Sequence, residues 1–185
     1  MTAHPADRQA ALDIVRPLRR AGHEAWFVGG CVRDELLGRT PREFDVATSA
    51  HPEQVTALFR RTVCVGAQFG VVIVVARGGE VEVATFRSDG AYVDGRRPTE
   101  VVYSDPLQDA QRRDFTVNGL FLDPETGEVL DLVGGRADLE AQVIRAIGDP
   151  EARFREDKLR MLRAVRFVAT HGMTLDPATR AAIED

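Results

Sequence analysis

Residues 27–34 read Phe27-Val28-Gly29-Gly30-Cys31-Val32-Arg33-Asp34, and Glu43-Phe44-Asp45 follows about ten residues later. The first stretch predicts a strand that runs into a glycine turn and a helix start, where backbone N–H groups can hold phosphate. The second stretch places Glu43 and Asp45 at positions i and i+2 of a short expected strand, so both carboxylates should point to one face. A phosphate-binding turn beside paired carboxylates suggests metal-assisted nucleotidyl transfer.

The length, composition and charge of the whole chain limit the functions that are compatible with this hypothesis. Its 185 residues, 44% of them hydrophobic and 29% charged, suit one generous domain or one domain plus the start of another. Cys31 and Cys64 are too few and too far apart for a zinc site or a disulfide framework. No apolar run approaches the roughly 18 residues that a membrane helix needs, and the N-terminus does not resemble a signal peptide. We therefore expect a cytoplasmic protein, and its net charge of −5 argues against a broad nucleic-acid-coating surface.

Periodicity and turn residues predict a mixed α/β (α+β) domain over residues 1–138, followed by a truncated helical module over 139–185. The polar segment 87–105 is expected to be a mobile loop. Helices are predicted over 6–21, 31–37, 52–60 and 150–170 and from 177 onward. Strands are predicted over 24–28, 44–47, 62–65, 71–76, 81–86, 115–122 and 128–132.

The carboxylates suit magnesium chemistry by type and by spacing. Magnesium takes oxygen ligands, usually one or two carboxylates together with substrate phosphates, and nucleotidyl transfer uses such ions to neutralise developing charge. Glu82 is the natural third acid, because Val81 and Val83 on either side can face the core while Glu82 faces the other way. Each feature taken alone also fits an ordinary solvated strand edge.

Six blocks in this chain, in the same order, resemble the class II tRNA nucleotidyltransferase and bacterial poly(A) polymerase family. Such an ordered set is far more specific than a lone Gly-Gly turn. The blocks are Gly29-Gly30-Cys31-Val32-Arg33-Asp34, Glu43-Phe44-Asp45-Val46-Ala47-Thr48, Val81-Glu82-Val83-Ala84-Thr85-Phe86-Arg87, Asp94-Gly95-Arg96-Arg97-Pro98, Arg112-Arg113-Asp114-Phe115-Thr116-Val117-Asn118 and Arg153-Phe154-Arg155-Glu156-Asp157-Lys158-Leu159-Arg160.

The resemblance implies a polymerase-β-like nucleotidyltransferase head, with a mixed and largely antiparallel sheet flanked by helices, followed by a truncated helical neck. It implies growth of a tRNA 3′ end from CTP and ATP with Mg²⁺ as cofactor. The metal-binding pair falls on Glu43 and Asp45, and the third catalytic acid on Glu82. The nucleotide-binding positions fall on Gly29, Gly30, Arg33, Arg113, Asp114, Asn118, Asp157 and Arg160.

Within these positions, the resemblance gives Asp114 a ribose contact, with help from Arg113. Asp157 and Arg160, spaced i and i+3 on an expected helix, would lie on one face and select the base. Cytosine and adenine each present an amine donor beside a ring-nitrogen acceptor, which a carboxylate and a guanidinium can match. Guanine and uracil reverse the pattern and leave buried polar groups unpaired. The alternative is an intrahelical salt bridge, and Glu156, Arg163 and Arg166 are expected to be positioning or solvent-facing residues.

One residue departs from the family pattern, which usually has Asp-x-Asp where this chain has Glu43-x-Asp45. The extra methylene moves the ligand by roughly 1–1.5 Å unless the chain adapts. A misplacement of that size can lower a rate about 100-fold, although we expect activity to survive. The loop over 87–105 looks complete, which in the family accompanies addition of the terminal adenosine.

Several functions remain open at this point. Residues 66–72, read as Gly66-Ala67-Gln68-Phe69-Gly70-Val71-Val72, look more like the tRNA enzymes than the poly(A) polymerases. A CCA-adding enzyme is therefore the first choice, and an A-adding or CC-adding enzyme or a poly(A) polymerase is the alternative. A weakly active or non-catalytic nucleotide- or RNA-binding module is the hypothesis from another class. Because family members continue into further helical domains, weak tRNA affinity is expected of these 185 residues.

Overall fold

A computed structural model describes residues 8–66, 69–90 and 100–184 of the chain. Its helices are α1 (Arg8–Arg20), α2 (Gly30–Leu36), α3 (Pro52–Leu58), α4 (Pro106–Gln111), the 3₁₀ helix η2 (Thr116–Asn118), α5 (Gly135–Glu140), α6 (Pro150–Glu156), α7 (Leu159–His171) and α8 (Pro177–Glu184). Its strands are β1 (Ala25–Val28), β2 (Asp45–Thr48), β3 (Thr62–Gly66), β4 (Val71–Ala76), β5 (Gly79–Thr85), β6 (Arg87–Asp89), β7 (Val101–Tyr103), β8 (Leu120–Leu122), β9 (Val129–Asp131), β10 (Val143–Ile144) and β11 (Thr174–Leu175).

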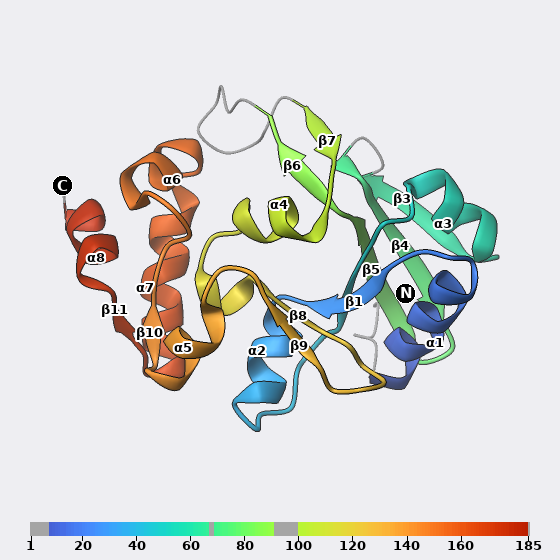
Figure 1. The fold of residues 1–185 in the computed structure, drawn as a ribbon, viewed down its shortest axis with the longest axis horizontal. Coiled ribbons are helices and arrows are strands. Elements are labelled where there is room, and N and C mark those ends of the chain that lie inside the picture. The colour runs from blue at the N-terminus through green and yellow to red at the C-terminus, as the bar shows by residue number, and fades with distance from the viewer. Residues whose placement is uncertain (1–7, 67–68, 91–99, 185) are drawn as a thin grey trace.

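The described residues form a seven-stranded sheet with the order β3-β4-β5-β2-β1-β8-β9 (Figure 1). Strands β2 and β5 pair in parallel, and the other neighbours in this sheet pair antiparallel. Two short pairs lie outside it, β6 with β7 and β10 with β11. The predicted fold class, a mixed and largely antiparallel sheet flanked by helices, is confirmed.

Alternating side chains give the sheet two different faces. Phe27 and Val46 point to the first face and pack into the main core, which α1 and α3 cover. Val28 and Ala47 point to the second face, where a smaller apolar cluster includes Ala110 of α4. Asp45 precedes Val46 and pairs with Val28, so its side chain also belongs to the second face. The first face therefore supplies stability, whereas the second face also carries polar groups.

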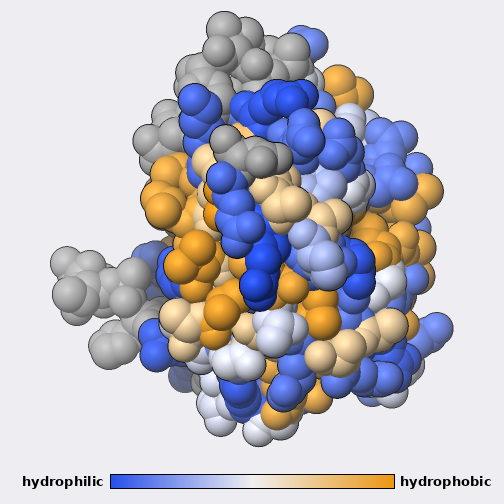
Figure 2. All heavy atoms as spheres, turned by 90° about the vertical axis from the view of Figure 1, so that its left-hand side faces the viewer, coloured by the Kyte–Doolittle hydropathy of each residue, from blue (hydrophilic) through white to orange (hydrophobic). Residues whose placement is uncertain are grey.

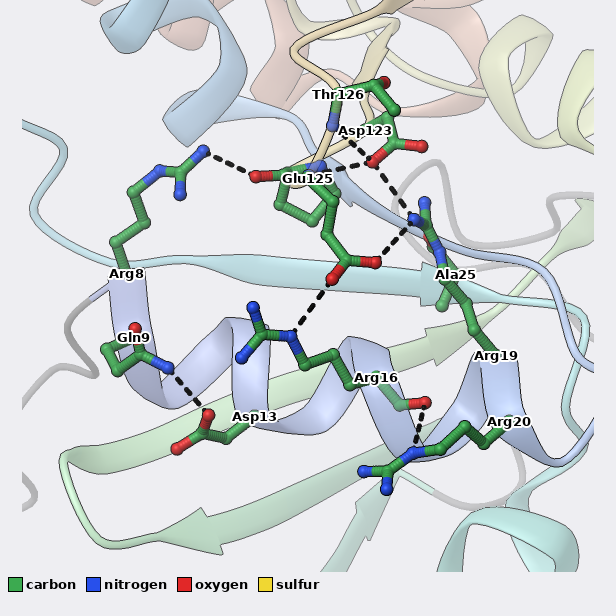
Figure 3. A network of polar contacts seen from close by, with 11 residues as sticks. Arg8, Gln9, Asp13, Arg16, Arg19, Arg20, Ala25, Asp123, Glu125 and Thr126 are labelled. Carbon is green, nitrogen blue, oxygen red and sulfur yellow. Dashed lines mark hydrogen bonds and ion pairs between the residues drawn. The ribbon is translucent and has the colours of Figure 1, made fainter.

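Helix α1 is tied to the turn between β8 and β9 by the polar contacts in Figure 3. Arg19 donates from Nη1 to Asp123 Oδ1 at 3.0 Å and from Nη2 to the carbonyl oxygen of Ala25 at 2.8 Å. Arg16 donates from Nε to Glu125 Oε1 at 3.0 Å. Exposed pairs such as Arg16–Glu125 add little stability, so the partly buried Arg19 contacts matter more for fixing the hairpin.

The expected loop over 87–105 is wrong at both of its ends. Residues 87–89 and 101–103 pair as the antiparallel ribbon β6–β7, and the Ser104 amide continues it by donating to the Phe86 carbonyl at 2.9 Å. Backbone N–H and C=O groups that are removed from water need hydrogen-bond partners, and the polar composition of the segment does not show that its two ends pair with each other. Residues 91–99, including the family block 94–98, lie outside the described residues.

The strand expected over 115–122 is limited to β8. The Thr116 amide donates to the Arg145 carbonyl at 3.0 Å, and the Gly119 amide donates to the Thr116 carbonyl at 2.9 Å, which closes the 3₁₀ turn η2. Phe115 forms only an isolated bridge with Ala146. These tertiary backbone contacts override the β-branched pattern of the segment. The predicted β8–β9 hairpin is confirmed.

The C-terminal helices gather at the end of the molecule opposite α1 and α3 (Figure 1). Viewed from that end, charged and apolar side chains are mixed on the surface (Figure 2). Residue 138 lies within α5, which contacts both η2 and β10, so the division of the chain at this residue stays a prediction. None of the helices in the described ranges is long and apolar enough to span a bilayer.

Glycine at position 135 allows α5 to approach η2 very closely. A Cβ atom built on Gly135 would lie 2.2 Å from the Thr116 carbonyl oxygen and 2.9 Å from Leu120 Cδ2. Asp131 fixes the same helix start, because its carboxylate accepts hydrogen bonds from the Gly135 and Arg136 amides at 2.9 and 3.0 Å. Any side chain at position 135 must therefore push the backbone of η2 aside.

We expect Gly135→Ala to lower the free energy of unfolding by about 1–3 kcal/mol, because the new methyl group overlaps backbone atoms that cannot rotate away. Urea unfolding followed by circular dichroism measures the change. Arg136→Ala, at an exposed position of the same helix, is the matched control and should stay within about 0.5 kcal/mol of the parent protein. Equal unfolding midpoints for the two variants would contradict the proposed close contact.

Candidate functional site

A cleft of about 770 Å³ lies over the second face of the sheet and is bounded by α7. It brings together all of the residues predicted from the sequence: Gly29, Gly30, Arg33, Glu43, Asp45, Glu82, Arg113, Asp114, Asn118, Asp157 and Arg160. Their roles remain predictions. Their convergence from α2, β2, β5, η2, α7 and the segments next to them shows that these blocks form one surface.

The glycine turn follows directly from β1. Gly29 has φ 73° and ψ −131°, a conformation that a residue with a side chain rarely adopts. The Arg33 amide donates to the Gly29 carbonyl at 3.2 Å as α2 begins. Cys31 donates from Sγ to the Val28 carbonyl at 3.2 Å, and burial raises the pKa of its thiol to about 12. Cys31 is therefore a neutral packing residue that helps fix the turn.

Strand register places Asp45 next to Glu82. The parallel pairs Val46–Val83 and Ala47–Ala84 continue one residue back to Asp45 and Glu82, whose side chains share the face opposite the valines. Glu43 also lines the cleft, but the prediction that it shares a strand with Asp45 is wrong, because β2 begins at Asp45. Glu43 lies in the irregular segment before the strand and has no ladder to fix it.

The surroundings of Asp45 strongly affect its ionisation. Burial above all, together with the nearby charges of Glu82 and Glu43, raises the pKa of Asp45 to about 7 against the opposing effect of Arg113. A cation bound between Glu43 and Asp45 would relieve this repulsion. In the described ranges, no three His, Cys, Asp or Glu side chains converge as a metal site. The pair therefore fits magnesium in its usual form, in which phosphate oxygens and water complete the ligands.

A chain of polar contacts crosses the cleft from α2 to α7. The Arg33 guanidinium donates to Asn118 Oδ1 at 2.7 Å, and Asn118 Nδ2 donates to Asp114 Oδ1 at 3.0 Å. Arg163 Nε donates to Asp114 Oδ2 at 2.6 Å. The Arg33 guanidinium also lies over the Phe167 ring, 5.1 Å from its centroid. Three predicted residues are thus linked to the helix that carries Arg163 and Phe167.

The predicted single helix through Asp157 and Arg160 is wrong. The backbone at Asp157 is extended, with φ −143° and ψ 103°, and this residue separates α6 from α7. Its Oδ1 accepts a hydrogen bond from the Leu159 amide at 2.9 Å, which is typical of aspartate at a helix start. Arg160 donates from Nη1 to Glu156 Oε2 at 2.7 Å, so Glu156 positions this arginine.

The family resemblance gives Arg163 and Arg166 no nucleotide contact and predicts positioning or solvent-facing residues at these places. Both line the cleft, together with Phe167. Arg160, Arg163 and Arg166 repeat every three residues along α7, and this spacing could have indicated a shared helix face. Residues 67–68 of the block 66–72 lie outside the described residues, so that comparison with the tRNA enzymes is untested.

The profile of the Poly A polymerase head domain matches residues 25–145, which is more than half of the chain. The chain belongs to this family. The family resemblance predicted from the six sequence blocks is thereby confirmed.

Curated relatives agree with this assignment. The chain is 47% identical over 186 residues to the CCA-adding enzyme of Lactiplantibacillus plantarum, and the alignment covers 100% of this chain and 46% of that relative. It is 50% identical over 174 residues to the CCA-adding enzyme of Bacillus subtilis, and this alignment covers 94% of the chain and 44% of the relative. The chain therefore spans about half the length of the curated relatives it matches.

Solved structures share the fold. A crystal structure of the Bacillus stearothermophilus CCA-adding enzyme in complex with CTP superposes with a TM-score of 0.86 at 44% identity, covering 94% of this chain and 42% of that one. A tRNA nucleotidyltransferase complexed with a primer tRNA and an incoming ATP analog gives a TM-score of 0.73 at 27% identity. That match covers 92% of this chain and 48% of the other.

The raised pKa of Asp45 makes a prediction for folding in the absence of metal. An acid whose pKa rises from its ordinary 3.8 to about 7 contributes stability below pH 4 that is lost as the pH rises through 7. We expect Asp45→Asn to stabilise the protein at pH 8 by about 1–3 kcal/mol, allowing for partial exposure of the group, and to leave it nearly unchanged at pH 4.

Thermal unfolding in a chelating buffer at the two pH values measures this difference. Asp13→Asn, at an exposed position of α1, is the control for the loss of one negative charge. Equal Tm values for Asp45→Asn and the parent protein at pH 8 would contradict the raised pKa of Asp45.

Proposed function

We propose that this chain is the nucleotidyltransferase head of an enzyme that adds CMP and AMP from CTP and ATP to the 3′ end of tRNA. The observation that carries the proposal is the placement of Asp45 and Glu82 side by side in a cleft that is also lined by arginines. The CTP-bound and tRNA-bound relatives support the same ligands. We also propose a cytoplasmic location and a head extending to about residue 138, with the start of a neck beyond it.

In this proposal, Glu43 and Asp45 hold Mg²⁺, and Glu82 is the third acid. When bound, the metal would lower the pKa of the attacking hydroxyl and neutralise charge on the transferred phosphoryl group. Asp45 must be ionised to take part, so magnesium competes with the proton that its raised pKa favours near pH 7. Glu82 keeps the local charge negative and thereby strengthens cation binding.

The phosphates and the ribose would meet different residues. Gly29 and Gly30 leave the turn open to a phosphate, and Arg33 supplies positive charge beside it. Arg113, which the resemblance links to the ribose, also reaches this turn, because its Nη1 lies 3.4 Å from a Cβ built on Gly29. Asp114 would accept a hydrogen bond from a ribose hydroxyl. Its Oδ2 already accepts from Arg163, whose side chain is 45% exposed, so the ribose would share or displace this contact.

Asp157 and Arg160 would select the base. Although they do not share a helix, both line the cleft, and Arg160 is held through Glu156 and through the Arg153 carbonyl, 2.9 Å from its Nη1. A carboxylate can accept from the exocyclic amine of cytosine or adenine while a guanidinium donates to the ring nitrogen. A guanine or uracil in the same place would leave both groups facing like partners, which strongly disfavours binding.

Transfer assays with tRNAs that end before CCA, after C or after CC test the function, with each nucleoside triphosphate supplied separately. We expect magnesium-dependent addition of C, C and A in that order. Asp45→Ala should abolish transfer, whereas Arg155→Ala, at an exposed position of α6, should leave it unchanged. Repeated A addition to any RNA end would instead identify a poly(A) polymerase, and retained nucleotide binding without transfer would identify a binding module.

The irregular backbone at Glu43 suggests that its longer side chain can adapt to a metal. We therefore expect Glu43→Asp to change kcat by less than about tenfold, whereas Glu43→Ala, which removes a metal ligand, should lower it at least 100-fold. Single-turnover transfer rates at saturating magnesium measure both effects. A gain in rate of 100-fold or more for Glu43→Asp would mean that the extra methylene misplaces the ligand.

A further inference from the structure

Asp109 is a buried acid that the sequence blocks did not single out. Its side chain is 1% exposed and accepts hydrogen bonds from two neighbouring arginines, one on each carboxylate oxygen. Arg112 donates from Nε and Nη2 to Oδ1 at 2.9 and 2.8 Å. Arg113 donates from Nε and Nη2 to Oδ2 at 3.2 and 2.9 Å. The carboxylate therefore fixes two guanidinium groups at once.

Helix α4 holds this carboxylate rigidly against the sheet. Asp105 caps the helix by accepting from the Gln108 amide at 2.9 Å, and Pro106 occupies the first helical position. Ala110, which follows Asp109, is buried in the apolar cluster on the second face of the sheet. The Arg87 amide of β6 also points to Asp109 Oδ1, at 3.4 Å. Asp109 therefore has little freedom to move.

The arrangement leaves one end of Arg113 directed at the glycine turn. Its Nε and Nη2 face Asp109, and its guanidinium lies over the Phe121 ring, 5.6 Å from the centroid. Its Nη1 is the nearest atom to a Cβ built on Gly29, at 3.4 Å. The part of the guanidinium not turned toward Asp109 thus lies above the turn.

The backbone of the same segment is held from the helical side. Arg153 donates from Nη2 to the carbonyl oxygens of both Arg112 and Arg113, the latter at 2.8 Å. Arg160 Nη2 lies 3.3 Å from the Arg112 carbonyl. The side chain of Arg113 is therefore fixed by α4, and the backbone of residues 112–113 is held by Arg153 of α6 and Arg160 of α7.

We propose that Asp109 is a positioning residue that holds Arg113 Nη1 over the Gly29–Gly30 turn, so that it meets the phosphates of the incoming nucleoside triphosphate. This inference rests on the proposed function, since it assumes that the turn receives phosphate. Asp109 itself does not touch the nucleotide. A carboxylate suits this place because each of its two oxygens accepts from one guanidinium, and its negative charge offsets part of the positive charge of the pair.

Asp109→Asn tests the inference by keeping the shape and removing the charge and one acceptor. Equilibrium titrations with CTP and with cytidine, both in magnesium, separate phosphate recognition from base and ribose recognition. We expect the affinity for CTP to fall about 10- to 100-fold, while the affinity for cytidine stays within about threefold of the parent value. Asp105→Asn, the same exchange on the same helix at a position where asparagine caps equally well, should change neither affinity.

A second variant guards against loss of folding. Arg113→Lys keeps the positive charge but cannot face Asp109 and the turn together, so it should show the same selective loss of CTP affinity. The double variant Asp109→Asn/Arg113→Lys should bind CTP no more weakly than Arg113→Lys alone. Additive losses in the double variant, equal losses for CTP and cytidine, or CTP affinity unchanged in Arg113→Lys would each overturn the inference. Absence of CTP binding by the parent protein would instead contradict the proposed function.

Discussion

The guanidinium of Arg33 is buried where α2, η2 and α7 meet, and the geometry of the cleft depends on it. Taking a charge out of water is expensive unless hydrogen bonds and an opposite charge replace the lost solvation. Asp34 supplies the charge at 2.8 Å, Asn118 supplies an acceptor, and Phe167 supplies a ring face. Asp34 lies beside Arg33 on α2, whereas Asn118 belongs to η2 and Phe167 to α7. Losing any of these partners would leave the buried charge incompletely paired.

This requirement joins the sheet-bearing part of the chain to its C-terminal helices. Asn118 passes the contact to Asp114, and Asp114 passes it to Arg163 on α7. Arg33, on the helix that follows the glycine turn, is therefore linked through Asn118 and Asp114 to α7. Hydrogen bonds between side chains, as well as apolar packing, therefore join α2 to α7 beside the cleft.

The sequence predicted the fold class, most elements and the convergence of the site residues, because alternating valines, glycine stops and ordered motif blocks are local signals. It failed where tertiary contacts decide the backbone. Asp157 ends one helix and starts the next, since its side chain bonds to the Leu159 amide instead of joining a continuous helix. The short helix α4 carries no periodicity long enough to detect, so Asp109 was missed although the adjacent Arg112-Arg113 block was recognised. The contact of Arg163 with Asp114 could not be predicted, because the two residues lie far apart in the sequence.

The parallel pairing of β2 with β5 has a consequence for the order in which the molecule folds. The β3–β4–β5 meander and the β8–β9 hairpin involve neighbours in the chain, whereas β2 pairs with β5 across α3, β3 and β4, and β1 pairs with β8 across a still longer stretch. Contacts between distant segments are entropically costly to form and therefore arise late. Asp45 and Glu82 are brought together by one of these non-local pairings, so their mutual repulsion is expected to act only after the local hairpins have formed.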